Sequence, residues 1–265
     1  MRREIKKLTT LLAAVALFVA AQLLAADAPP KPTPILVELF TSEGCSTCPP
    51  ADALLEKLDS SQPVPGAQLI VLSEHVDYWD RLGWKDPFSS SVVTDRQAVY
   101  AAKFKLESSY TPQMIVDGST EFVGNNSHLA EQALQKAVSA QKGSIRISSV
   151  SSDAPGKLSA SLEADGLPAG TNADVYFVVA LNHAESQVER GENKGHHLVY
   201  VAVVESITKV GTTDKSRNFA KQIEVKIHPH TDLSNVRVIA FLQQHGSGPV
   251  IGAAMSTVPP QSASQ

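Results

Sequence analysis

Cysteine is scarce in this sequence: only two of the 265 residues are cysteines, Cys45 and Cys48. Small secreted domains without a sufficient core are held together by several disulfides, and two cysteines cannot supply such a framework. A chain of this length does not need one, because it can bury one large core or two ordinary ones. The sequence therefore excludes a disulfide-stapled miniprotein and leaves the two thiols to be explained on other grounds.

Neither sign of charge is in large excess, with 23 Lys and Arg residues against 27 Asp and Glu residues and a formal net charge of −4. The charges are spread along the chain, so there is no basic stripe of the kind that binds nucleic acid and no polybasic patch for a membrane surface. We therefore expect no nucleic-acid partner.

Long apolar runs are also few, and the most apolar segment is Leu8–Ala26. Its uninterrupted part falls short of the about 20 residues that span a bilayer. A basic start, an apolar middle and small residues at the end are typical of a secretory signal peptide. The basic residues before this segment and the polar residues within it are Arg2, Arg3, Lys6, Lys7, Thr9, Thr10 and Gln22. We predict a cleaved signal peptide over 1–26 of a bacterial periplasmic or secreted protein, with no stable membrane insertion; an uncleaved anchor is the alternative.

The first half of the mature chain has the pattern of an α/β domain, predicted over 35–141 with an insertion around 75–90, after a proline-rich spacer at 27–34. Two nearly all-apolar runs indicate strands buried on both faces of a sheet, and three segments have helical spacing. The expected order is strand 35–40, helix 51–58, strand 68–72, helix 91–104, a hairpin of 114–118 and 120–123, and helix 125–140. A helical crossover makes the first two strands parallel.

The second half has a different texture, with seven short runs rich in Val, Ile and Thr and no convincing helix. The runs are 145–150, 158–164, 174–182, 198–204, 222–227, 236–242 and 250–255. Such runs, separated by Gly, Pro, Asn and Asp, predict an antiparallel β-sandwich. We expect this second domain over 143–258, followed by a disordered tail at 259–265.

The cysteine pair, Cys45-Ser-Thr-Cys48, stands between the first predicted strand and the first helix. A thiol reacts as the thiolate, and a helix N-terminus favours the charged form through its dipole and its unpaired N–H groups. We interpret Cys45 as the more exposed nucleophile and Cys48 as the resolving partner in thiol–disulfide exchange. A purely structural disulfide is a weaker explanation, because closing so short a loop constrains the unfolded chain little.

Two other interpretations of the pair stay open. Copper or zinc could be held by the pair together with His75, although a closed zinc site needs four ligands and no second CxxC follows; copper(I) accepts fewer and softer ligands. Alternatively the protein is a non-catalytic module that binds a partner. Our main prediction has no cofactor and no resident metal, with a protein or a small-molecule thiol or disulfide as the partner.

Further candidates for the site lie near the pair in the predicted fold. Glu38 interrupts the first strand seven residues before Cys45, and a carboxyl buried behind a dithiol can accept or return a proton. His75, Tyr78 and Trp79 follow the second strand, whose C-terminal end opens on the same edge as the cysteines, so they are candidates for contacting a substrate.

Other polar residues are expected to be solvated or structural. Arg96 and Gln97 are predicted on the surface of the helix at 91–104. The later histidines have irregular spacing and are not expected to bind ligands; they are His183, His196, His197, His228, His230 and His245.

A Thr-Pro pair, Thr111-Pro112, directly precedes the predicted hairpin and is a candidate for a cis peptide bond. A strand, a CxxC and a helix, followed later by Thr-Pro, a hairpin and a final helix, resemble the thioredoxin fold. This resemblance implies that Pro112 is cis and lies against Cys45. It also implies that Thr111 presents its backbone to an incoming chain.

Five longer motifs make the resemblance more specific: VELFTSEGCSTCPPADALL, HVDYWDRLGWKDPFSS, RQAVYA, YTPQMIVDG and GENKGHHLVYVAVV. Together they resemble the bacterial exported family called domain of unknown function 1223, described as thioredoxin-like with an added C-terminal domain. The motifs span about residues 37–204. The resemblance implies a thioredoxin-like α/β domain followed by an all-β, sandwich-like domain, and with the cysteine chemistry it predicts an exported thiol–disulfide oxidoreductase.

Overall fold

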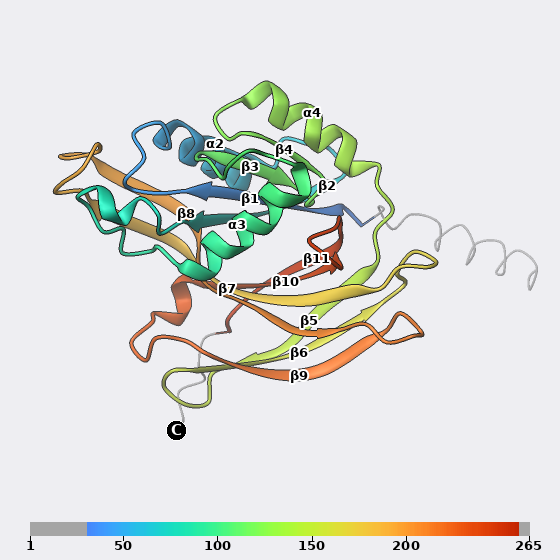
Figure 1. The fold of residues 1–265 in the computed structure, drawn as a ribbon. Helices are drawn as coiled ribbons and strands as arrows, with labels where there is room; N and C mark the ends of the chain where they lie inside the picture. Colours follow the sequence, from blue (N-terminus) through green and yellow to red (C-terminus); the bar gives the residue numbers. More distant parts are fainter. Residues whose placement is uncertain (1–30, 260–265) are drawn as a thin grey trace, which may run out of the picture. The chain divides into compact units, whose positions relative to one another are not determined.

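A computed structural model describes residues 31–259, and from Thr33 onward these belong to one compact unit (Figure 1). The predicted signal peptide at 1–26, the first half of the spacer at 27–34 and nearly all of the tail at 259–265 lie outside the described residues. No helix within 31–259 is long and apolar enough to cross a membrane.

The first half of this unit contains the elements that the sequence predicts, in the predicted order. They are β1 (Thr33–Thr41), α2 (Pro49–Ser61), β2 (Ala67–His75), α3 (Ser91–Phe104), β3 (Gln113–Val116), β4 (Thr120–Val123) and α4 (Ser127–Val138). A short 3-10 helix that the sequence does not predict, η1 (Asp80–Leu82), lies between β2 and α3. The hairpin between β3 and β4 turns at Asp117 and Gly118, which both have positive φ, as the Asp-Gly pair predicts. β2 runs three residues beyond the predicted strand, so His75 ends the strand instead of following it.

The second half supplies seven strands, one for each predicted run. They are β5 (Ser144–Ser151), β6 (Lys157–Asp165), β7 (Ala173–Gln187), β8 (His197–Thr212), β9 (Phe219–Lys226), β10 (Val236–Gln244) and β11 (Val250–Thr257), with a 3-10 turn, η2 (Leu233–Asn235), before β10.

These strands do not form a sheet system of their own. Four of them extend the first sheet, which has eight strands in the order β11-β10-β7-β8-β2-β1-β3-β4, while β5, β6 and β9 form a separate antiparallel sheet. β1 and β2 are parallel, as predicted, and β2 pairs with β8 in parallel at Ser73 and Val203. Strands from both predicted domains, 35–141 and 143–258, therefore share one sheet, because β8 covers the edge that β2 would otherwise leave unpaired.

Each face of the large sheet is covered by a different layer (Figure 1). The apolar residues of α2 and α4 pack on one face of β1, β2 and β3, and α3 packs on the opposite face together with residues of β7 and β10. The three-stranded sheet packs against β7, β10 and β11 through a further apolar cluster. The fold is thus a mixed α/β sheet with parallel strands plus a small antiparallel sheet.

Strand β1 shows why an almost continuous apolar run is required at the centre. Ile35, Val37 and Leu39 face α2 and α4, whereas Leu36 and Phe40 face α3, and all five side chains are fully buried. Because side chains alternate between the faces of a strand, a run without alternation is what burial on both faces demands. β1 ends directly in the turn that carries the cysteines.

Candidate functional site

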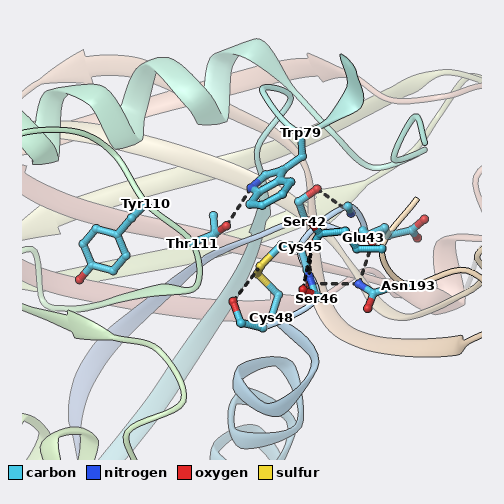
Figure 2. Close-up of a disulfide and its surroundings, with 12 residues drawn as sticks. Ser42, Glu43, Cys45, Ser46, Cys48, Trp79, Tyr110, Thr111 and Asn193 are labelled. Atoms are coloured by element: carbon cyan, nitrogen blue, oxygen red, sulfur yellow. Dashed lines mark hydrogen bonds between the residues drawn. A yellow bond between two sulfur atoms is a disulfide. The ribbon is translucent and has the colours of Figure 1, made fainter. Parts of the chain in front are cut away.

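The two cysteines form a disulfide at the start of α2 (Figure 2). Their Sγ atoms are 2.11 Å apart and their Cα atoms 5.4 Å apart. Pro49 opens the helix, where a missing N–H group costs little because the first turn has no acceptor for it. The backbone N–H groups of Ala51 and Asp52 donate to the carbonyl of Cys48 at 2.8 and 3.1 Å. The disulfide therefore sits where the helix dipole stabilises a thiolate once the pair is reduced.

Both cysteines are fully buried in this oxidised state. Cys45 and Cys48 each have an exposed fraction of 0%, whereas Ser46 and Thr47 between them are exposed. The prediction that Cys45 is the more exposed thiol is therefore wrong. The physical reason is that segments distant in sequence pack against the turn.

Trp79 and Thr111 close one side of the turn (Figure 2). The indole Nε1 of Trp79 donates to Oγ1 of Thr111 at 2.9 Å. A Cβ on Gly44 would lie 2.9 Å from the Cβ of Trp79, so the chain approaches the tryptophan more closely there than a larger residue permits. The tryptophan thus connects the residue before Cys45 with the residue before Pro112.

Pro112 lies beside the first turn of α2. The Thr111–Pro112 peptide bond is cis. A Cβ on Gly124 would lie 3.2 Å from the Cβ of Pro112 and 3.3 Å from the Cβ of Ala51, and the N–H of Gly124 donates to the carbonyl of Pro112 at 2.9 Å. The segment that precedes β3 is therefore packed against the helix start that carries the cysteines.

Replacing Gly124 with alanine is expected to destabilise the protein by about 1–3 kcal/mol. The added methyl group would also lie 2.7 Å from Cδ1 of Leu39, so the Pro112 segment or α2 has to move. Urea unfolding of the oxidised protein measures the change. Val123→Ala, at a neighbouring exposed side chain, is the control and should change stability little. Equal stability of Gly124→Ala and the unmodified protein would contradict the close packing.

The tip of the β7–β8 hairpin, residues 188–196, closes another side of the turn. Nδ2 of Asn193 donates to the carbonyls of Glu43 and Cys45 at 2.9 and 3.0 Å. Oε2 of Glu192 accepts the N–H of Ser46 at 3.2 Å and its hydroxyl at 2.6 Å. Asn193 is buried with an exposed fraction of 4%, so these contacts join a segment about 150 residues away to the cysteine turn.

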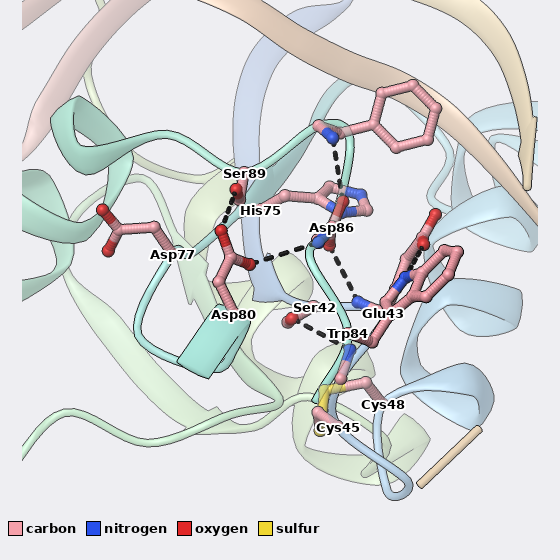
Figure 3. Close-up of polar contacts among 12 residues, drawn as sticks. Ser42, Glu43, Cys45, Cys48, His75, Asp77, Asp80, Trp84, Asp86 and Ser89 are labelled. Atoms are coloured by element: carbon pink, nitrogen blue, oxygen red, sulfur yellow. Dashed lines mark hydrogen bonds and ion pairs between the residues drawn. A yellow bond between two sulfur atoms is a disulfide. The ribbon is translucent and has the colours of Figure 1, made fainter. Parts of the chain in front are cut away.

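A buried polar cluster lies near the turn, and we define it as Glu43, Asp52, His75, Asp86 and Tyr200. Nδ1 of His75 is 2.7 Å from Oδ2 of Asp86, which also accepts the N–H of Glu43 at 2.8 Å (Figure 3). The aromatic rings of His75 and Tyr200 meet edge to face, 4.6 Å apart. His75 was predicted to contact substrate, but its exposed fraction is 1%, so it belongs to this interior cluster.

Asp52 brings a titratable carboxyl into the cluster. It follows Cys48 by one helical turn on the same face of α2, and side chains on a helix tilt toward the N-terminus, here toward Cys48. Burial raises the pKa of Asp52 to about 7, against the opposing effect of nearby His75. Burial alone would lower the pKa of His75, but the Asp86 carboxylate raises it above its usual value. Near neutral pH, Asp52 is therefore poised to gain or lose a proton.

Glu38, predicted as the proton-transferring carboxyl, lies elsewhere. It is on the same face of β1 as Leu36 and Phe40, the face covered by α3, whereas α2 and its cysteines pack on the other face. Its carboxylate accepts from Nε of Arg96 at 2.6 Å and from the hydroxyl of Tyr100 at 2.7 Å. The run around Glu38 is apolar on both faces, so its sequence could not indicate which face carries α2.

The other predicted residues are brought only partly into the site. Tyr78 is half-buried, and its hydroxyl donates to Oε1 of Gln97 at 3.2 Å, while burial raises its pKa to about 12. Arg96 and Gln97, predicted on the helix surface, are buried with exposed fractions of 8% and 0%. The structure therefore places Cys45, Cys48, Thr111, Pro112 and Trp79 around one turn, with His75 behind it and Glu38 apart.

Sequence reasoning missed three residues that meet the cysteine turn: Asp52, Glu192 and Asn193. One signal was available for Asp52, because it precedes Leu55 and Leu58 by three and six residues and so shares their buried stripe on α2. Glu192 and Asn193 lie in the GENKG motif, and only the pairing of β8 with β2 brings that motif to the turn. Within 31–259, no group of three or more His, Cys, Asp or Glu residues is arranged to hold a metal ion.

Comparisons with known proteins agree with this architecture. A crystal structure of a protein from Agrobacterium tumefaciens matches with a TM-score of 0.67 and 22% identity, covering 88% of this chain and 98% of that one. The structure of HBP35 of Porphyromonas gingivalis matches with a TM-score of 0.62 and 15% identity, covering 88% of this chain and 79% of that one. No curated protein matches the sequence. The model of a protein family of unknown function, DUF1223, matches residues 36–243, and the chain therefore belongs to this family.

Proposed function

We propose that this protein is an exported, thioredoxin-like thiol–disulfide oxidoreductase that works through Cys45 and Cys48. The observation that carries the proposal is the position of the disulfide, at the N-terminus of α2, beside the Pro112 segment and one helical turn from a carboxyl with a pKa of about 7. Export rests on the basic and apolar pattern of 1–26.

The thioredoxin-like part of the proposal rests on the arrangement of the first half of the chain. The strands β2, β1, β3 and β4 are neighbours in the sheet, with α2 and α4 on one face and α3 on the other. The strand, cysteine turn and helix come first, and the Thr111-Pro112 segment leads into the hairpin. This order of strand, cysteine turn, helix, Thr-Pro segment and hairpin is the one through which the sequence resembles the thioredoxin fold.

The reaction is an exchange of disulfides. A substrate thiolate attacks Sγ of Cys45, which forms a mixed disulfide and breaks the bond to Cys48, and Cys48 leaves as a thiolate. A second substrate thiolate attacks the substrate sulfur of the mixed disulfide, and Cys45 leaves as a thiolate. Two electrons pass to the protein, so the substrate becomes a disulfide and the cysteine pair becomes a dithiol. The reverse sequence reduces a substrate disulfide.

In this exchange, Asp52 is the group that gives a proton to Cys48 or takes one from it. Cys48 needs a proton when it leaves as a thiolate, and it must give one up to act as an attacking group in the reverse direction. A carboxyl with a pKa of about 7, on the same helix face, holds that proton in an appreciable fraction of molecules at neutral pH.

A second candidate function is a binding module in which the disulfide is not cycled. The burial of both sulfurs favours it, because a substrate cannot reach Sγ of Cys45 without a movement of the covering segments. The two functions differ in one measurable property, which is whether the pair exchanges with thiols in solution.

The test equilibrates the protein lacking residues 1–26 in glutathione buffers and measures the pair by intact mass, where reduction adds two hydrogen atoms. We expect a midpoint between about −120 and −320 mV, the range of known exchange proteins and cellular thiol pools. Cys48→Ser should trap a mixed disulfide with glutathione at Cys45, and Cys45→Ser is the matched control that should trap much less. A pair that stays oxidised across this range, with no trapped species, would point to the binding module.

A further inference from the structure

The hairpin tip at 188–196 is folded on itself before it meets the cysteine turn. The N–H of Gly195 donates to the carbonyl of Val188 at 2.8 Å, and the N–H of Val188 donates to the carbonyl of His196 at 3.0 Å. Val188 is fully buried and anchors the base of the tip, whereas Glu192 and Lys194 are exposed. The tip is therefore a preformed unit whose base is anchored by the buried side chain of Val188.

The contacts of the tip with the cysteine turn are mainly polar. Asn193 donates to two carbonyls and Glu192 accepts two hydrogen bonds from Ser46, and of these four bonds the two at Ser46 are exposed to water. Gly191 adds one apolar contact, since a Cβ there would lie 3.1 Å from the Cβ of Trp84. Segments held by few apolar contacts and exposed hydrogen bonds open with low free energies, well below that of global unfolding.

These contacts are made to Cys45 itself and to the residue that follows it in the cysteine turn. Asn193 binds the carbonyl of Cys45, and Glu192 binds the N–H of Ser46 directly after it. An extended polypeptide carries N–H donors and carbonyl acceptors at every residue, so it can replace both contacts at once, whereas a small thiol cannot.

We propose that the 188–196 hairpin is a gate over the Cys45–Cys48 disulfide, opened by a polypeptide thiol that takes over the hydrogen bonds of Asn193 and Glu192. The inference rests on the proposed exchange function and specifies its substrate class. In the closed state both sulfurs are covered, and attack at Sγ of Cys45 follows opening. The substrate contributes the binding free energy that holds the gate open.

Asn193→Asp tests the gate because it keeps the size of the side chain, removes both donors and places a carboxylate against carbonyl oxygens. The measured quantity is the rate of disulfide reduction by a neutral water-soluble phosphine. The phosphorus attacks one sulfur, the S–S bond breaks, and water converts the thiophosphonium into phosphine oxide, leaving two thiols. We expect the rate to rise about tenfold or more, since the lost bonds stabilise only the closed state.

Matched variants at the same tip act as controls. Glu192→Gln keeps an acceptor for Ser46 and should raise the rate by less than Asn193→Asp, whereas Lys194→Ala, at an exposed side chain, should leave it unchanged. Thr111→Val removes the hydrogen bond of Trp79 on the other side of the turn. If Thr111→Val accelerates reduction and Asn193→Asp does not, Trp79 is the cover and the hairpin gate is wrong. Far-ultraviolet circular dichroism confirms that each variant is folded.

The substrate class is tested with the unmodified protein. A blocked peptide with a central cysteine should react at least about tenfold faster than N-acetylcysteine amide at equal thiolate concentration, because only the peptide extends past the reacting residue on both sides. Equal rates would overturn the assignment of a polypeptide substrate. The phosphine needs no thiol exchange, so rapid phosphine reduction of Asn193→Asp with no reaction toward any thiol would contradict the proposed function and leave the gate standing.

Discussion

Replacing Asp52 with asparagine is expected to raise the free energy of unfolding at pH 8 by up to about 4 kcal/mol. This is the free energy that corresponds to a carboxyl pKa of about 3.9 in the unfolded chain and about 7 in the folded protein. The charged carboxylate is costly in the buried cluster, and asparagine carries no charge to desolvate. At pH 3 the carboxyl is protonated in both states, so variant and unmodified protein should differ little there.

The pH dependence has a definite sign. A folded-state pKa above the unfolded one means that the folded protein holds its proton more strongly, so the contribution of Asp52 to stability is lost as pH rises from about 4 to 7. Subtracting the urea-unfolding curve of Asp52→Asn from that of the unmodified protein isolates this slope, about 1.4 kcal/mol per pH unit. Asp95→Asn, on the exposed face of α3, is the control. If the stabilities of the Asp52 variant and the unmodified protein change in parallel between pH 4 and 8, the pKa of Asp52 is not raised by burial.

The same substitution separates the chemistry of Asp52 from its effect on stability. If Asp52 supplies the proton to Cys48, Asp52→Asn slows exchange although it makes the fold more stable. If Asp52 only destabilised the fold and took no part in the chemistry, replacing it would not slow the exchange reaction. Two opposite changes in one variant are therefore the signature that connects this carboxyl to the cysteine pair.

Local patterns predict the elements of the fold well because each has a strong physical requirement. The continuous apolar run at 35–40 needs burial on both faces, and β1 has it. The Asp117-Gly118 pair supplies the positive φ angles that the β3–β4 turn uses. These signals depend on neighbours in the sequence, so they survive without knowledge of the rest of the molecule.

Long-range pairing is what the sequence leaves open. β2 meets β8 through Ser73 and Val203, and no local pattern distinguishes a strand that extends a mixed sheet from one in a separate sandwich. The pairing also determines part of the candidate site, because it brings Glu192 and Asn193 to the cysteine turn. The assignment of the buried carboxyl failed for a related reason. Two faces of one strand are equally apolar, and only the placement of α2 distinguishes them.

Arg96 shows how the two halves of the chain are joined in the interior. Its guanidinium donates to Glu38 on β1 at 2.6 Å and to Oε1 of Gln243 on β10 at 3.1 Å, and it lies 3.9 Å from Glu74 on β2. The carboxyls of Glu38 and Glu74 are fully buried, and burial together with the neighbouring Glu38 charge raises the pKa of Glu74 well above its usual value. One cation therefore serves two buried carboxyls on strands of the first half and an amide on a strand of the second.

Replacing Arg96 with methionine is expected to destabilise the protein by about 3–5 kcal/mol at pH 8, because it leaves buried carboxyls without a cation. Arg96→Met combined with Glu38→Gln should recover much of the stability, since the pair is then removed together, and the non-additivity measures their coupling. Arg146→Met, at an exposed ion pair, is the control and should change nothing measurable. If the Arg96 and Glu38 substitutions are instead strictly additive, the guanidinium is not what compensates the buried charge of Glu38.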